Sequence, residues 1–246
     1  MESIETLAVP ANHWRWRHPK NLAAVVCVGL AAYVGIAYLV LPAAWRAHAR
    51  HHPGLADVSR VTVTRDGIPG DPLNVALVGD RDRLEAALST AGWQAADPLG
   101  LRSDVRIAAD TALHRPYAAA PVSNLYLFGR REDLAFEQPA GQDPRRRHHV
   151  RFWCVDQLDA AGRPWFVGAA TFDRRVGLSR DTGQVTHHIA PDVDAERDHL
   201  LHTLTTAGQL ADRYYVDDFH SVRAGRNGGG DPWQTDGRLA VAVVIP

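Results

Sequence analysis

A run of arginine and histidine between Arg145 and Arg151 has the residue types and spacing to bind an anion. If the run is a strand, successive side chains point to opposite faces, so Arg147, His149 and Arg151 share one face. Guanidinium groups hold carboxylate or phosphate oxygens in pairs, and an imidazole between them can donate a proton to a leaving oxygen. The alternative is a solvated edge strand whose charges discourage aggregation.

Two later segments carry polar side chains that are candidates for the same site. Asp173 ends an apolar strand, while His187 and His188 precede a helix that contains Arg197. Adjacent histidines on a strand point in opposite directions, so at most one is expected to enter a shared site. Asp192 or Asp194 is expected to cap the helix. A hard-cation or zinc site is the alternative, but no established ligand spacing supports it.

A glycine-rich segment, Arg226 to Asp231, is a candidate for wrapping an anion with backbone N–H groups, and a flexible turn is the alternative. It lacks the lysine and hydroxyl residue of a phosphate-binding P-loop. The dinucleotide motif G-x-G-x-x-G is also absent. Nucleotide hydrolysis and a Rossmann cofactor are therefore disfavoured.

These segments predict two groups of site residues. The candidate catalytic residues are His149, Arg151, Asp173, His187, His188 and Arg197. The candidate substrate-binding residues are Arg147, Asn227 and Asp231. The sequence assigns no metal ligand and identifies no cofactor.

The helices and strands that must position these residues predict an α+β domain with a mixed or antiparallel sheet and flanking helices. Apolar and β-branched runs predict the strands, and apolar residues at helical spacing predict the helices. The expected strands are 58–64, 73–78, 124–128, 134–138, 147–156, 165–172, 214–216 and 239–245, with the middle ones forming a meander. The expected helices are 80–92, 101–113 and 193–208.

A transmembrane helix is predicted from Leu22 to Leu41, because twenty residues without a charged or strongly polar side chain span about 30 Å. A signal peptide and a buried core helix are the alternatives. Residues 1–21 form a tail, 42–56 a juxtamembrane linker and 57–246 the domain. Basic residues slightly favour a cytoplasmic N-terminus, so we expect a single-pass membrane protein with an extracytoplasmic domain.

Composition narrows the class of protein. The chain has 246 residues, 46% hydrophobic and 22% charged, which suits a packed domain. Residues 57–246 carry 22 basic and 26 acidic side chains, which disfavours nucleic acid as a partner. The two cysteines form no disulfide framework and no thiolate zinc motif.

Several short motifs occur together in an order that resembles the LssY C-terminal domain family, over most of residues 70–246. They are Ala91-Gly-Trp93 with Ala96-Asp-Pro98, Pro121-Val-Ser123 with Leu125 to Gly129, Pro144 to Arg151, Val176 to Ser179, Thr186 to Ile189 and Pro191 to Arg197. The resemblance implies a bacterial, membrane-associated protein, often fused to lipid-phosphatase-like domains and linked by name to type I secretion. It implies no established reaction. This chain departs from the fused architecture, with one span and no phosphatase motif.

Together these features favour a membrane-anchored domain that binds an anionic, phosphate-bearing envelope ligand such as a lipid headgroup. If turnover occurs, the expected reaction is phosphoester hydrolysis, with arginines neutralising developing charge. The expected partners are the lipid bilayer and the anionic lipid. The rival hypothesis is a noncatalytic interaction module with a protein partner in an envelope or type I secretion-associated assembly.

Overall fold

The computed structural model describes residues 19–44, 60–96, 124–141, 146–180, 183 and 185–246. Its larger sheet has eight strands and contains the middle of the chain as an antiparallel meander. The meander strands are β7 (Leu134–Pro139), β8 (Arg147–Leu158), β9 (Pro164–Leu178) and β10 (Val185–Ile189). The predicted α+β class with a mixed sheet is confirmed. The meander contains the expected strands at 134–138, 147–156 and 165–172, but the expected strand at 124–128 belongs to a different sheet.

The remaining strands of this sheet extend it on both sides of the meander. Its order is β11-β14-β3-β9-β8-β7-β4, with β10 also paired to β9. The added strands are β3 (Val75–Val78), β4 (Gln94–Ala95), β11 (Leu210–Val216) and β14 (Leu239–Val244). Only the pairing of β14 with β3 is parallel among the described strands. β3 is buried along its whole length, as expected for a central apolar strand.

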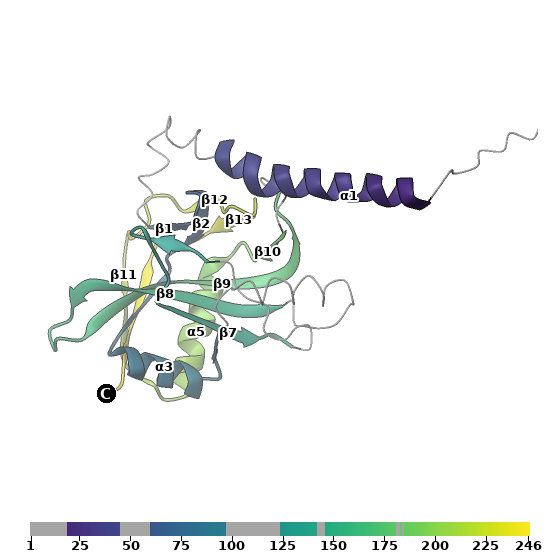
Figure 1. Ribbon diagram of the computed structural model, residues 1–246. Coiled ribbons are helices and arrows are strands. Elements are labelled where there is room, and N and C mark those ends of the chain that lie inside the picture. Colours follow the sequence, from purple (N-terminus) through teal and green to yellow (C-terminus); the bar gives the residue numbers. More distant parts are fainter. Residues whose placement is uncertain (1–18, 45–59, 97–123, 142–145, 181–182, 184) are drawn as a thin grey trace, which may run out of the picture.

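Two helices cover one face of the large sheet, α3 (Arg81–Thr90) and α5 (Val193–Thr206), as Figure 1 shows. They bury leucines such as Leu84, Leu88, Leu200 and Leu204 against strand residues. Asp192 caps α5 by accepting hydrogen bonds from two backbone N–H groups, which confirms the expected cap. Asp80 precedes α3 but makes no capping bond with its side chain.

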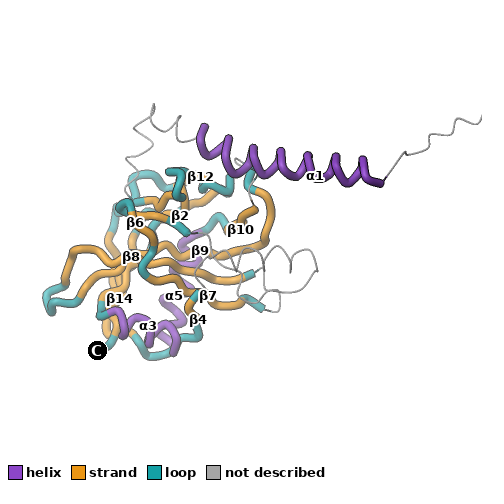
Figure 2. Tube along the Cα trace, viewed as in Figure 1, coloured by secondary structure: helices purple, strands orange, loops and turns teal. Residues whose placement is uncertain are grey.

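The opposite face of the large sheet is covered by smaller β structure (Figure 2). A four-stranded sheet has the order β2-β1-β5-β6, and β12 pairs with β13. Their bounds are β1 (Val61–Val63), β2 (Pro69–Pro72), β5 (Tyr126–Leu127), β6 (Arg130–Arg131), β12 (Ala224–Arg226) and β13 (Pro232–Gln234). Leu125 and Leu127 pack on Trp153 and Ala169 of the large sheet. These short strands leave room beneath them for a cavity.

Several boundaries differ from the sequence predictions. β9 continues to Leu178, so Asp173 lies inside a strand and not at its end. β2, β4, β6, β12 and β13 were not expected, because these segments contain no run of β-branched or apolar residues. The predicted helix 101–113 lies outside the described residues.

An apolar helix precedes the domain. It comprises α1 (Pro19–Gly35), a π-helical stretch (Ile36–Val40) and a further short helical stretch. Ala23–Ala44 is long and apolar enough to cross a membrane, and a signal sequence near an N-terminus would pass the same test. The Tyr33 hydroxyl donates to the backbone oxygen of Gly183, between β9 and β10, at 2.7 Å. The length and composition of the helix are compatible with a single-pass membrane protein.

Asn74 joins three parts of the domain and generates a prediction about stability. Its fully buried amide donates to the backbone oxygens of Ala170 on β9 and Val193 on α5, and accepts from the Ala170 N–H. Asn74→Ala leaves these buried groups unpaired, so the free energy of unfolding should fall by about 3 kcal/mol. Denaturant unfolding of the full chain in detergent measures this. Gln157→Ala, at an exposed site, should change it by less than about 0.5 kcal/mol.

Candidate functional site

The arginine and histidine run of the sequence forms the floor of a cavity. β8 lies between β7 and β9, so its residues are internal to the sheet, which excludes the solvated edge-strand alternative. Arg147, His149 and Arg151 share the face opposite α5 and are only 3%, 2% and 4% exposed. Buried cations require partners, and the surrounding strands supply them.

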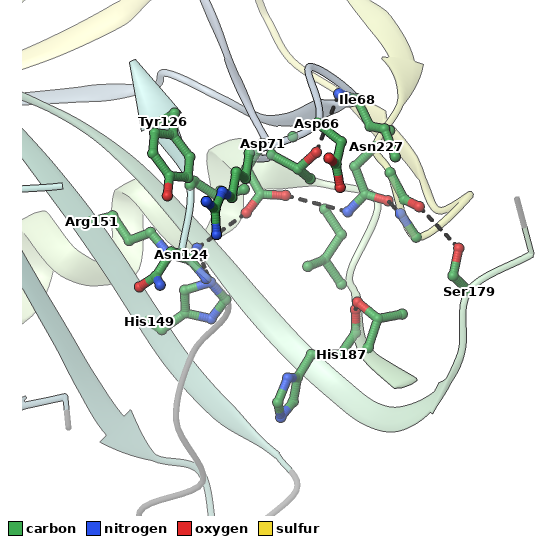
Figure 3. Close-up of a pocket in the computed structure, with 18 of the residues that line it drawn as sticks. Asp66, Ile68, Asp71, Asn124, Tyr126, His149, Arg151, Ser179, His187 and Asn227 are labelled. Carbon is green, nitrogen blue, oxygen red and sulfur yellow. Dashed lines mark hydrogen bonds and ion pairs between the residues drawn. The ribbon is translucent and has the colours of Figure 1, made fainter. Parts of the chain in front are cut away.

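The cavity has a volume of about 330 Å³ and lies between this floor and the smaller β structure, as the close-up in Figure 3 shows. β8, which forms the floor, contributes one side of the cavity together with β9 and β10. The turn between β1 and β2, the segment 124–126 and the glycine-rich loop contribute the others. The polar side chains that line it are Thr64, Arg65, Asp66, Asp71, Asn124, Tyr126, His149, Arg151, Asp173, Ser179, Thr186, His187 and Asn227.

Arg151 links His149 to an acid that the sequence analysis missed. Its Nη1 lies 3.3 Å from Oδ2 of Asp71 and 2.9 Å from Nε2 of His149. Because a guanidinium can only donate, Nε2 of His149 must accept. The hydroxyl of Thr171 lies 2.8 Å from the same nitrogen. A neutral His149 therefore carries its proton on Nδ1, which lies 3.3 Å from Oδ1 of Asp173.

Arg147 lies directly behind the lining residues and connects two of them, Asp173 and His187, with Glu137. Its Nη1 donates to Glu137 Oε2 at 2.6 Å, its Nε donates to Asp173 Oδ2 at 3.1 Å, and its Nη2 lies 3.2 Å from Nε2 of His187. Burial acts to raise the pKa of Asp173, but His149, His187 and Arg147 outweigh it and hold the pKa well below the usual range. Asp173 is therefore an anion at neutral pH.

His187 is neutral at physiological pH. Burial lowers its pKa to about 4, and the positive charge of Arg147 acts in the same direction while Asp173 opposes it. Its Nε2 must accept from Arg147, so the proton is on Nδ1. That Nδ1 has no hydrogen-bond partner among the described residues. His187 can therefore donate a hydrogen bond to a ligand, but its basic nitrogen is already engaged.

The glycine-rich loop is held by its own asparagine. The side-chain oxygen of Asn227 accepts from the N–H groups of Gly229 and Asp231, and its backbone oxygen accepts from Gly230. Its amide donates to Asp71 at 3.3 Å. Three N–H groups of the loop are thus already bonded within it, so they are not available to wrap an anion.

Asp231 fastens this loop to β10 on the side away from the cavity. One of its oxygens lies 2.8 Å from Nδ1 of His188, and the other accepts from the N–H of Ile189 at 3.2 Å. His188 and Asp231 do not line the cavity. Alternation along β10 separates His188 from His187, as the sequence analysis expected for adjacent histidines.

Arg197 also lies away from the cavity. It is on α5, which covers the other face of the large sheet, and pairs with Asp194, Asp198 and Asp236. The structure thus brings five predicted residues to the cavity, His149, Arg151, Asp173, His187 and Asn227. It places Arg147 behind them and His188, Asp231 and Arg197 elsewhere. The proposed catalytic and binding roles stay predictions.

Asp71 and Glu137 are the main residues that sequence reasoning missed. Asp71 is flanked by Gly70 and Pro72, which read as a turn, although β2 is a buried strand. Glu137 follows Phe136 in a strand with mixed burial, and it faces the predicted cationic face of β8 at His149. An acidic residue opposite a row of buried cations indicates an ion pair, but this signal can be recognised only when the register of the two strands is known.

The lining is not electropositive. Asp66, Asp71 and Asp173 outnumber Arg65 and Arg151 by one charge, and His187 is neutral. Behind the floor, Arg147 and Glu137 offset each other. Within the part of the chain that the structure describes, no group of three or more His, Cys, Asp or Glu side chains is arranged to hold a metal ion.

The comparison with protein families matches residues 55–239 to the family described as the LssY C-terminus. The chain belongs to the LssY C-terminal family. The matched range includes every strand and turn that contributes a residue to the cavity, so the cavity is part of the LssY C-terminal domain. The comparison with curated proteins and the comparison with solved structures each find no match.

The buried charge of Arg147 predicts a large loss of stability on neutralisation. Arg147→Met leaves Glu137 and Asp173 buried without their cation, which should lower the free energy of unfolding by about 3 to 5 kcal/mol. Arg146→Met, at the adjacent exposed position, is the matched control and should cost less than about 1 kcal/mol. Equal losses for the two variants in denaturant unfolding would contradict the role of the buried pairs.

The lowered pKa of His187 predicts a pH dependence. Between the pKa of 6.5 of an unfolded histidine and about 4 in the fold, the unfolded chain binds the extra proton. His187 should therefore reduce stability progressively as the pH falls through this window, by up to about 3 kcal/mol. Unfolding of His187→Gln should show a shallower fall between pH 6.5 and 4 than the wild type. His199, whose pKa is lowered to about 4 mainly by burial, acts in the same direction in both proteins. Identical slopes would contradict the assignment.

Proposed function

We propose that the LssY C-terminal domain binds an anionic, phosphate-bearing ligand of the cell envelope, such as a lipid headgroup, in the cavity. The observation that supports this is the convergence of His149, Arg151 and His187 from two different strands around one hollow. An apolar helix able to cross a membrane precedes the same domain. Together these observations support recognition of a polar ligand near the bilayer surface.

The ligand would meet donors that are fixed before it arrives. Arg151 is held by Asp71 and His149, and Asn227 is held by its loop, so their positions cost little to organise on binding. The Nδ1 proton of His187 is an additional donor at the wall. Preorganised donors of this kind suit phosphate and hydroxyl oxygens.

Binding is favoured over hydrolysis by the state of the two imidazoles. General-base or nucleophilic catalysis requires a nitrogen lone pair directed at the ligand or at water. The lone pair of His149 accepts from Arg151, and that of His187 accepts from Arg147. Hydrolysis would require one histidine to exchange its guanidinium partner for the ligand, so we propose binding as the principal activity.

The proposal places the protein in a bacterial cell membrane with the domain outside the cytoplasm. Three basic residues, Arg15, Arg17 and Lys20, precede the membrane-spanning candidate Ala23–Ala44, and two, Arg46 and Arg50, follow it closely. The side with more Lys and Arg stays cytoplasmic by the positive-inside rule. An impermeant cysteine reagent applied to whole cells carrying Gln157→Cys would label the domain in this orientation.

A noncatalytic interaction module of an envelope or secretion-associated assembly is the second candidate. The edge strand β11 favours it, since Tyr214, Tyr215 and Val216 are each more than a third exposed there. Exposed aromatic residues are enriched at protein interfaces. Under this alternative, variants of the cavity leave complex formation intact.

Binding of a soluble headgroup tests the proposal. Isothermal titration calorimetry of the full chain in detergent with inositol phosphate should detect binding, and Arg151→Gln should weaken it about 10-fold or more, because a charge-assisted bond is lost. Arg83→Gln, at an exposed site on α3, is the matched control. Thermal unfolding identifies any variant that fails to fold, and His149→Gln is the second variant.

Two results would contradict the proposed function. One is the absence of binding by the folded wild type to inositol phosphate and to vesicles containing phosphatidylinositol. The other is equal binding by the wild type and by folded Arg151→Gln and His149→Gln proteins.

A further inference from the structure

The two arginines that line the cavity differ in how they are neutralised. Arg151, in the floor, is buried beside Asp71 and donates a hydrogen bond to His149. Arg65, at the rim, is exposed and makes no ion pair among the described residues. An unpaired guanidinium retains its full capacity for a phosphate fork. The rim therefore carries the lining cation that is best suited to an anion.

The turn between β1 and β2 fixes the backbone at Arg65. The N–H of Gly67 donates to the backbone oxygen of Thr64 at 2.9 Å, and the N–H of Ile68 donates to the Thr64 hydroxyl at 3.2 Å. Gly67 has a φ of 78°, which favours glycine at this corner. Asp66, the neighbour of Arg65, has an interaction partner of its own.

The floor, in contrast, disfavours a phosphate group. Asp71 and Asp173 both line it, and Asp173 stays ionised because its pKa is held low by His149, His187 and Arg147 against the effect of burial. Phosphate oxygens only accept hydrogen bonds and carry charge of the same sign as these carboxylates, so close approach is repulsive. The positive charge of Arg151 is offset by Asp71 at 3.3 Å.

Hydroxyl groups match the floor better, because each one both donates and accepts. Carboxylate oxygens of Asp71 can accept from a hydroxyl, while Arg151 and the Nδ1 of His187 can donate to it. Donors and acceptors are thus both present around the floor, and both carboxylates keep their ionised state when a neutral hydroxyl binds. Polar groups arranged in this way reject a ligand that lacks the matching hydroxyls.

We infer that the ligand is a phosphate ester of a polyol, which binds with its phosphate at the rim beside Arg65 and its hydroxyl-bearing part in the floor. This inference rests on the proposed function and adds the orientation and the chemical class of the ligand. A bare phosphate would then bind weakly, and the uncharged polyol would occupy the floor by itself.

Calorimetry of the full chain in detergent tests the inference with three probes, inositol phosphate, inositol and inorganic phosphate. Arg65→Gln should weaken inositol phosphate binding about 10-fold and leave inositol binding within about twofold. Arg65→Lys should restore part of the loss, because it keeps the charge. Arg83→Gln, an exposed site on α3, should change neither.

Asp71→Asn provides a test with opposite signs. Removing this charge should tighten the binding of inorganic phosphate, since Arg151 loses its carboxylate neighbour. It should weaken the binding of inositol, since the amide is a poorer acceptor for a hydroxyl than the carboxylate. Thermal unfolding shows whether this buried variant is folded. If it is not, Arg65→Gln decides the question, because Arg65 is exposed.

The possible failures are distinguishable. Inositol phosphate binding that is insensitive to Arg65→Gln but lost in Arg151→Gln overturns the orientation and leaves the proposed function standing. If inorganic phosphate binds as tightly as inositol phosphate, the inference that the ligand is a polyol is overturned. No binding of any phosphate compound by the wild type contradicts the proposed function itself.

Discussion

The burial of Arg147 is the constraint on which the cavity floor depends. A guanidinium that is 3% exposed must be neutralised and hydrogen-bonded, and Glu137, Asp173 and His187 do this from three neighbouring strands. The same contacts fix the tautomer of His187 and contribute, after His149 and His187, to the lowered pKa that keeps Asp173 ionised. Asp173 in turn faces the Nδ1 of His149. The buried contacts of Arg147 behind the floor thus contribute to the chemistry available in the cavity.

This constraint explains why the site favours recognition over reaction. Each imidazole uses its basic nitrogen to accept from an arginine, and both deep arginines are neutralised by carboxylates. Such a network is rigid, and it holds donors and acceptors in place at little further entropic cost. The exposed Arg65 differs from them in keeping an uncompensated charge, so the anionic part of a ligand and its polar part have different places to bind.

Much of the architecture was predictable because it depends on local periodicity. Alternation in residues 147–156 correctly gave a strand with Arg147, His149 and Arg151 on one face, and leucine spacing gave the helix that begins at Val193. The strands β2, β4, β6, β12 and β13 were not predictable, since they contain no run of β-branched or apolar residues. Asn74 shows the same limit at the level of a residue, because its three hydrogen bonds join segments about a hundred positions apart.

The amino-acid sequence alone determined the apolar helix, the strand alternation, the family resemblance and the cationic face of β8, because each is a pattern among neighbouring residues. Only the tertiary structure decided which residues share the cavity. It brought Asp71 and Asn227 to Arg151, and it left Arg197 on the far side of the sheet and His188 on the far side of β10. The physical reason is that ion pairing depends on distance in space, and sheet register, which sets that distance, is decided by packing between segments far apart in the chain.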